Sequence, residues 1–116
     1  MAIELGTLAR RAVAVAEDKQ AHDIMMLDLR GLTTIADYFV LGTAESERQL
    51  RAVLKALDEE LGNVGAPPPR IEGTPETGWI ILDFGGLMIH LFSPEQREFY
   101  RLERLWKNAQ PVVVVQ

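Results

Sequence analysis

The stretch from Trp79 to Trp106 constrains the fold more than any other part of the chain, because two apolar runs meet there at Gly85-Gly86. Two glycines between β-rich runs favour a two-residue hairpin loop, since the turns that suit strand twist need positive φ, which glycine adopts without a steric penalty. The pattern therefore predicts strands over residues 79–84 and 87–92, paired at the centre of a sheet.

The two-residue loop sets the register of this hairpin, with Trp79 opposite Phe92 and Asp83 opposite Met88, and register decides which side chains share a face. One face is entirely aliphatic or aromatic and suits packing under helices: Ile80, Leu82, Phe84, Leu87, Ile89 and Leu91. The other, which we call the mixed face, suits a contact surface or a shallow site: Trp79, Ile81, Asp83, Met88, His90 and Phe92.

Asp83 and His90 are diagonal neighbours on the mixed face, within reach of a hydrogen bond. We interpret them as a paired polar couple that satisfies a half-buried histidine, in preference to a catalytic dyad. No nucleophile in the sequence is placed to complete a triad with them.

A helix is predicted directly after the hairpin, because Ser93, Pro94 and Gln96 form the start signal known as a capping box. The spacing of Phe99, Leu102 and Trp106 predicts an apolar stripe along this helix, which Leu105 broadens. The basic side chains are expected to face outward: Arg97, Arg101, Arg104 and Lys107.

The upstream half of the chain reads as alternating helices and strands. Helical spacing of apolar residues predicts a helix over residues 3–18, and short apolar runs predict strands over 24–29 and 38–43. Ser46, with Gln49 three residues on, repeats the capping-box pattern, so a second helix is predicted from there to Gly62. We expect this helix to cover the aliphatic face of the sheet.

The remaining segments are connectors and edges. Three consecutive prolines, residues 67–69, predict a stiff extended connector, followed by a brief edge strand at 71–73. Pro111 and the four valines after it cannot continue a helix and indicate an added edge strand or a disordered tail. We therefore predict one domain over residues 1–108 and a C-terminal tail over 109–116.

Composition excludes several classes of protein. The chain has 116 residues, enough for one domain with a core of its own, and no cysteine, which excludes disulfide frameworks and thiolate zinc sites. A net charge of −5 argues against nucleic acid as the main partner and favours a basic protein. No secretory signal and no apolar run long enough to span a membrane is present, so we expect a cytoplasmic protein.

Tests for chemistry are negative. The sequence contains no glycine-rich phosphate loop, no paired-histidine metal motif and no nucleophile elbow, so we predict neither catalysis nor a cofactor nor a metal. Two alternatives stay open. The first is a dimerisation module whose mixed face pairs with itself, and the second is an enzyme. Asp28, Asp37 and Asp83 fall at or near strand ends and, with His90, could serve a nucleotide- or metal-binding enzyme of nucleotidyltransferase-like fold.

Five motifs together resemble the ribosomal silencing factor family, RsfS, also called Iojap, over about residues 3–107. They are A-D-Y-F-V at 36–40, S-x-x-Q at 46–49, Glu72-Gly73, W-x-x-x-D-x-G-x-x-x-x-H-x-F at 79–92 and R-x-F-Y-x-L-E-x-L-W at 97–106. The resemblance implies an α/β domain with a mixed five-stranded sheet flanked by helices, in the order αββαβββα. This topology is nucleotidyltransferase-like, without transferase activity.

The resemblance also implies a function. Family members bind protein fourteen of the large ribosomal subunit and sterically block joining of the small subunit, which lowers translation when nutrients are short. They are often homodimers. This expectation agrees with the residue-based reading of an acidic domain that lacks a catalytic set and carries a mixed aromatic and polar sheet face.

Partner-binding residues are implied by the motifs rather than by spacing. The positions carried over are Trp79, Asp83, His90, Phe92, Arg97, Tyr100, Glu103 and Trp106, to which the mixed face adds Met88. We expect contact first at Trp79, Asp83, His90 and Tyr100, because spacing alone explains Phe92, Phe99 and Trp106 as core. Gly86 departs from the family, which usually has an acidic residue after the turn glycine.

Overall fold

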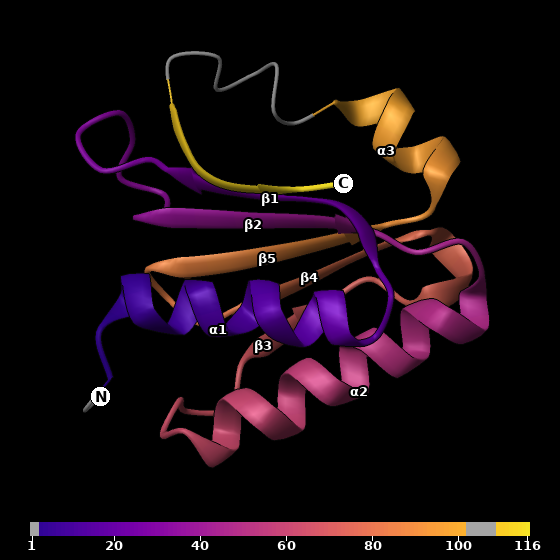
Figure 1. Cartoon of the computed structure of the whole chain (residues 1–116), viewed down its shortest axis with the longest axis horizontal. Coiled ribbons are helices and arrows are strands. Elements are labelled where there is room, and N and C mark those ends of the chain that lie inside the picture. The colour runs from indigo at the N-terminus through magenta and orange to yellow at the C-terminus, as the bar shows by residue number, and fades with distance from the viewer. Residues whose placement is uncertain (1–2, 102–108) are drawn as a thin grey trace.

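The computed structural model describes residues 3–101 and 109–116 (Figure 1). Its elements follow one another as α1 (Leu5–Asp18), β1 (His22–Asp28), β2 (Tyr38–Thr43), α2 (Glu47–Asn63), β3 (Arg70–Glu72), the 3₁₀ turn η1 (Pro75–Thr77), β4 (Trp79–Asp83), β5 (Leu87–Phe92), α3 (Pro94–Tyr100) and β6 (Gln110–Val115). This confirms the predicted α/β class and the order αββαβββα. None of the helices that the structure describes is long and apolar enough to cross a membrane.

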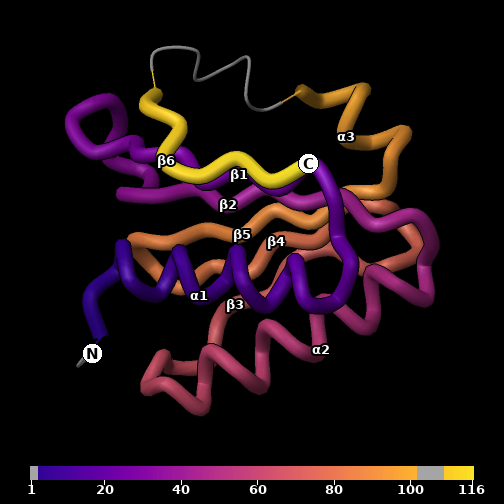
Figure 2. Tube along the Cα trace, in the orientation of Figure 1, coloured from indigo at the N-terminus to yellow at the C-terminus, as the bar shows by residue number. Residues whose placement is uncertain are grey.

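The strands form one mixed six-stranded sheet in the order β3-β4-β5-β2-β1-β6. The β2–β5 pair is parallel and the other four pairs are antiparallel. The sheet has one strand more than the five predicted, because the C-terminal residues form the added edge strand that was one of the two expectations for the tail, and pair with β1 as β6. Figure 2 follows the Cα trace of β6 along β1.

The central hairpin has the register that the sequence predicted. Trp79 lies opposite Phe92 and Asp83 opposite Met88. The backbone N–H of Phe84 donates to the carbonyl oxygen of Leu87 at 2.9 Å, which closes the two-residue loop. Gly85 has a φ of +90°, as the first position of a type II′ turn requires.

Helices α1 and α2 lie together across one face of the sheet (Figure 1), and the predicted aliphatic face packs beneath them. Ile80, Leu82, Leu87 and Ile89 on this face are all fully buried. At about 25 cal/mol per Å² of apolar area, burial of this face is the main source of the stability of the fold.

Gln49 joins the start of α2 to the end of α1. Its backbone N–H donates to Ser46 Oγ at 3.1 Å, which is the predicted cap. Its side-chain oxygen accepts from the N–H of Glu45 at 2.7 Å, one residue earlier than a capping box would place it. Its amide nitrogen donates to the carbonyl of Gln20 at 2.8 Å, so one side chain fixes how the two helices meet.

Helix α3 is shorter than the sequence predicted. Ser93 Oγ accepts from the N–H of Gln96 at 3.3 Å, as expected of the cap. However, Arg101 has a φ of +45°, which ends the helix after seven residues, about two turns, and its N–H makes the last helical bond, to the carbonyl of Arg97. The predicted continuation past Arg101 was therefore wrong at that residue. The predicted helical residues 102 and 104–107 lie outside the described residues.

Candidate functional site

The mixed face of the hairpin extends across the neighbouring strands as a second apolar cluster. Its buried members are Leu27, Leu29, Ala36, Phe39, Leu41, Phe92 and Ala109, with Met25, Trp79 and Met88 partly buried against them. Helices α1 and α2 cover the opposite face, and α3 stands at one end of the sheet (Figure 1). The partly buried side chains of the cluster therefore reach solvent on this side.

Trp79 links the mixed face to α3. Its ring lies 4.2 Å, centroid to centroid, from the ring of Tyr100 and is stacked on Phe92 at 5.3 Å. Its indole N–H donates to Nδ1 of His90 at 3.2 Å. Aromatic ring pairs such as Trp79–Tyr100 and Trp79–Phe92 each contribute about 0.5–1.5 kcal/mol of stability beyond the effect of the area they bury. Trp79 and Tyr100, two of the four residues expected first to bind a partner, are thus in direct contact with one another.

His90 is buried more deeply than the sequence suggested, with only 4% of its surface exposed. Burial lowers the pKa of its imidazole to about 4, so the ring is neutral at pH 7. Because Nδ1 accepts the indole bond, Nε2 carries the proton, and it has no hydrogen-bond partner among the described residues. The ring packs against Phe39, with the centroids 4.7 Å apart. His90 therefore lies beneath the exposed part of the mixed face and holds Trp79 in place.

The predicted Asp83–His90 couple does not form. The register is diagonal as expected, but Asp83 Oδ1 accepts from the backbone N–H of Gly85 at 2.8 Å and so braces the hairpin loop. His90 uses its one acceptor nitrogen for Trp79. Each of the two polar groups therefore bonds to another partner, and Asp83 is half-buried. Met88, directly opposite Asp83, is also half-buried.

Arg97 faces inward rather than outward as predicted. Its Nη1 donates to Oγ1 of Thr43 at 3.0 Å, and Thr43 is only 2% exposed. This bond ties α3 to the end of β2. It makes Arg97 a positioning residue for the neighbouring Tyr100 as well as a candidate for partner contact.

Phe99 also lies elsewhere than the sequence predicted. It was expected in the core, yet it is 76% exposed and meets the edge of Tyr100 at 5.0 Å. Tyr100 is itself 41% exposed. Successive residues are about 100° apart around a helix axis, so Phe99 and Tyr100 cannot both point in one direction. This spacing was the feature of the sequence that could have indicated an exposed Phe99. Glu103, also expected to contact the partner, lies outside the described residues.

The acidic residues of the alternative enzyme site lie toward the same end of the sheet, since the backbone of Asp37 bonds to Leu29 and to Gly86 of the hairpin loop, but they do not form a metal-binding group. The side chain of Arg30 donates two hydrogen bonds to the carboxylate of Asp28, at 2.7 and 3.0 Å. These bonds lower the pKa of the Asp28 carboxyl group. Asp83 braces the hairpin loop, and Asp37 is exposed. Among residues 3–101 and 109–116, no group of three or more histidine, cysteine or acidic side chains could hold a metal ion.

Comparison with known proteins identifies the family to which this arrangement of strands, helices and aromatic residues corresponds. The family described as "Ribosomal silencing factor during starvation", RsfS, matches residues 2–116. The chain belongs to this family. The predicted resemblance is confirmed, and the match extends past residue 107 through β6.

Individual RsfS relatives agree with this assignment. The chain is 32% identical to the ribosomal silencing factor RsfS of Bacillus subtilis, over 89% of this chain and 87% of the relative. It is 35% identical to the mouse "Mitochondrial assembly of ribosomal large subunit protein 1", over 81% of this chain and 42% of that protein. A crystal structure of a Chromobacterium violaceum protein has a TM-score of 0.86 and 27% identity, covering 98% of this chain and 95% of that one.

Proposed function

We propose that this RsfS-family chain binds the large ribosomal subunit through its protein fourteen and sterically blocks joining of the small subunit, which represses translation when nutrients are limiting. Binding, rather than turnover, is the whole of this activity, and it requires neither metal nor cofactor. We place the protein in the cytoplasm and expect the free form to be a homodimer.

One observation carries the proposal. Trp79, Ile81, Asp83 and Met88 are half-buried on the mixed face, whereas the opposite face of the same two strands is buried under helices. Half-exposed aromatic and methionine side chains are enriched at protein interfaces, and aromatic anchors supply much of the affinity there. On α3, the exposed Tyr100 contacts Trp79 and the exposed Phe99 contacts Tyr100, so these two rings extend the surface.

Charge and kinship support the same partner. The chain has a net charge of −5, which favours a basic surface over bare phosphate. The mouse relative is named for assembly of the large ribosomal subunit, which points to that subunit. The proposed contact set is Trp79, Asp83, Met88, His90, Arg97, Tyr100 and Glu103, with His90 acting through Trp79.

The test is sedimentation of the purified protein with isolated large subunits, followed by addition of small subunits. We expect stable association with the large subunit and a loss of joined ribosomes. Asp83→Asn keeps an acceptor for the Gly85 N–H and removes only the charge, so it should weaken association while the hairpin stays intact. Lys55→Glu on the exposed side of α2 is the matched control, because it changes charge on the opposite layer.

Two outcomes would reject the proposal. A protein that stays at the top of the gradient at micromolar concentration does not bind the subunit. A protein that binds without reducing subunit joining does not act by occlusion. The enzyme alternative is tested separately by titration calorimetry with magnesium and nucleoside triphosphates, where we expect no binding heat.

A further inference from the structure

The start of α1 presents backbone donors that the helix itself does not use. Its first hydrogen bond runs from the N–H of Leu8 to the carbonyl oxygen of Glu4, and the side chain of Glu4 does not cap the helix. The N–H groups of residues 5–7 come before this bond and donate to no other residue that the structure describes. These groups and the positive end of the helix dipole attract an anion. Water satisfies most helix starts, so the neighbouring side chains decide whether an anion binds.

Tyr38 places a buried donor at the same position, because α1 and β2 start at the same end of the sheet (Figure 1). Its side chain is only 7% exposed, and its hydroxyl group makes no hydrogen bond within the described part of the chain. The hydroxyl lies against the first turn of α1, since a Cβ atom on Gly6 would come within 3.2 Å of it. A buried hydroxyl without a partner is unusual in a folded protein, and a ligand would satisfy it.

Two arginines add positive charge to these donors. Thr7, Arg10 and Arg30 line a hollow of about 330 Å³ together with Tyr38, and we call it the α1 hollow. The guanidinium carbon of Arg30 lies 5.2 Å from the centroid of the Tyr38 ring. Arg30 uses Nε and Nη2 for Asp28, which leaves its Nη1 available. Arg10 forms no ion pair with any described residue.

The two carboxylates beside the α1 hollow leave it open to an anion. Asp28 accepts one backbone and two side-chain bonds from Arg30, so its negative charge is compensated. Glu4 is exposed, and its Oε1 lies 2.9 Å from the position that a Cβ atom on Gly6 would take. It bonds to no described residue, so an incoming anion displaces it without breaking an ion pair. Glu4 is therefore a competitor whose removal should strengthen anion binding.

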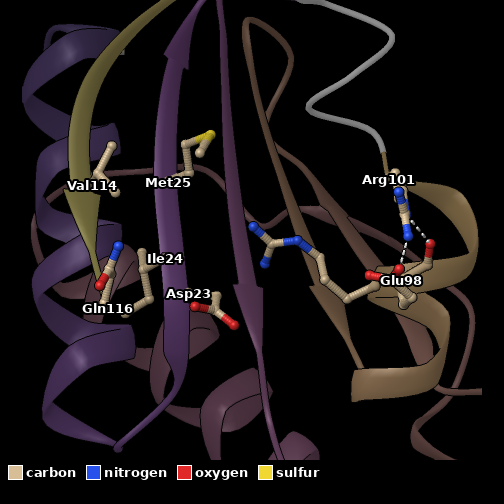
Figure 3. Close-up of a pocket in the computed structure, with 8 residues that line it drawn as sticks. Asp23, Ile24, Met25, Glu98, Arg101, Val114 and Gln116 are labelled. Carbon is tan, nitrogen blue, oxygen red and sulfur yellow. Dashed lines mark hydrogen bonds and ion pairs between the residues drawn. The ribbon is translucent and has the colours of Figure 1, made fainter.

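A larger hollow elsewhere lacks these features. Figure 3 shows it between β1 and α3, with a volume of about 510 Å³. Its two arginines already have partners, because Arg97 donates to Thr43 and Arg101 pairs with Glu98. No buried, unpartnered polar side chain is found among the described residues that line it. Size alone therefore does not select the α1 hollow, whereas its free donors do.

We propose that the α1 hollow binds a phosphate group, either free inorganic phosphate or the phosphate of a small monoester. The groups left for a ligand are all donors: the N–H groups of residues 5–7, the Tyr38 hydroxyl, the Arg10 guanidinium and Nη1 of Arg30. A phosphate dianion accepts through several oxygen atoms at once, so it uses such a set better than a carboxylate or chloride does. A hollow of about 330 Å³ is at the small end of ligand sites, which suits a small molecule.

This inference does not depend on ribosome binding. Met26, Tyr38 and Val112 line the α1 hollow and belong to the core under the helices, on the opposite side of the sheet from the mixed face. Because both arginines are exposed to solvent, we expect a dissociation constant on the order of 1 mM. Binding this weak gives no measurable heat at micromolar protein concentration, so it does not affect the nucleotide titration proposed above.

The first experiment is a magnesium-free NMR titration of the isotope-labelled full chain with inorganic phosphate, in which sodium chloride keeps the ionic strength constant. We expect the amide signals of residues 5–7 to shift and to saturate with a dissociation constant on the order of 1 mM. Shifts that do not saturate, or that saturate elsewhere in the chain, would overturn the proposal.

Tyr38→Phe is the most informative variant, because it keeps the ring beneath Arg30 and removes only the hydroxyl. Phosphate affinity should fall about threefold or more, while the melting temperature should not fall, since the hydroxyl has no hydrogen bond to lose. A purely structural tyrosine would give the reverse result. Unchanged phosphate affinity in Tyr38→Phe would contradict the proposed site.

Two charge variants test the electrostatic part of the site. Arg10→Gln should weaken phosphate binding about threefold, and Glu4→Gln should strengthen it. Arg48→Gln is the matched control, because Arg48 is exposed on α2 and its loss changes the net charge equally. Equal effects of Arg10→Gln and Arg48→Gln would mean that phosphate responds only to the overall charge, and the site would be rejected.

A second titration, with glycerol phosphate, identifies the source of the phosphate group. Tighter binding of the ester assigns the α1 hollow to a phosphorylated small molecule, and weaker or equal binding assigns it to inorganic phosphate. Sedimentation with large subunits is scored separately. Loss of subunit association alone would reject the proposed function, whereas loss of phosphate binding alone would reject only this inference.

Discussion

The indole N–H of Trp79 donates to Nδ1 of His90 at 3.2 Å, so a half-exposed surface residue is held by a buried neutral imidazole. The bond fixes the tautomer of His90 and the orientation of Trp79 together. Trp79 in turn meets Tyr100 of α3 at 4.2 Å. The shape of the proposed contact surface therefore depends on His90, which is too deeply buried for a partner to touch.

His90 should make the stability of the fold pH-dependent. Burial lowers its pKa to about 4 from an ordinary value of 6.5. Between these values the unfolded chain binds a proton that the folded chain does not, so the free energy of unfolding should fall as the pH drops from 6.5 to 4, by up to about 3 kcal/mol. Urea denaturation at several pH values measures this fall.

His90→Gln is the informative variant for this prediction, because it can still accept the Trp79 bond but does not titrate. It should show a shallower fall in stability over the same range than the parent chain does. Equal pH profiles for His90→Gln and the parent chain would exclude His90 as the source.

Removing the indole donor should leave His90 Nδ1 buried without a partner. Trp79→Phe preserves an aromatic ring for Phe92 and Tyr100 but lacks the N–H. We expect a loss of about 1–3 kcal/mol in the free energy of unfolding, the usual cost of an unsatisfied buried acceptor. Chemical denaturation followed by circular dichroism tests this. No loss would show that the bond contributes nothing to stability.

Phe99 should contribute to partner binding without contributing to the fold. Because its side chain is 76% exposed, Phe99→Ala should change the free energy of unfolding by less than about 0.5 kcal/mol. If it is an anchor in the interface, the same change should weaken association with the large subunit by more than about 1 kcal/mol. Leu32→Ala, also exposed at 46%, is the control at a loop site. Equal binding by both variants would remove Phe99 from the interface.

Arg97 and Thr43 should act as a coupled pair that holds α3. Arg97→Met removes the donor to a buried hydroxyl, and we expect it to cost about 1–2 kcal/mol of stability. In a cycle with Thr43→Val, the double variant should lose less than the sum of the two single losses. Additive losses in this cycle would mean that the bond does not couple the two residues. Weaker ribosome binding by Thr43→Val, which leaves Arg97 itself in place, would show that α3 must be positioned.

Local patterns in the sequence determined the parts of this fold that depend on neighbouring residues. The register of the hairpin followed from Gly85-Gly86, because loop length and the alternation of side chains leave one pairing that buries every apolar residue of one face. The helix starts at Ser46 and Ser93 followed from capping chemistry, which acts over three residues. The family followed from motifs that combine both.

Only the tertiary structure decided which polar groups bond to one another and whether the C-terminal segment joins the sheet. Asp83 and His90 are near each other in register, yet each bonded elsewhere, because a bond between side chains depends on orientations that spacing does not specify. Arg97 turned inward because Thr43, distant in sequence, lies at the end of β2. The sequence left open whether the C-terminal valines form an edge strand or a disordered tail, and the structure pairs them with β1 as β6. That pairing joins segments far apart in the sequence, which no local pattern specifies.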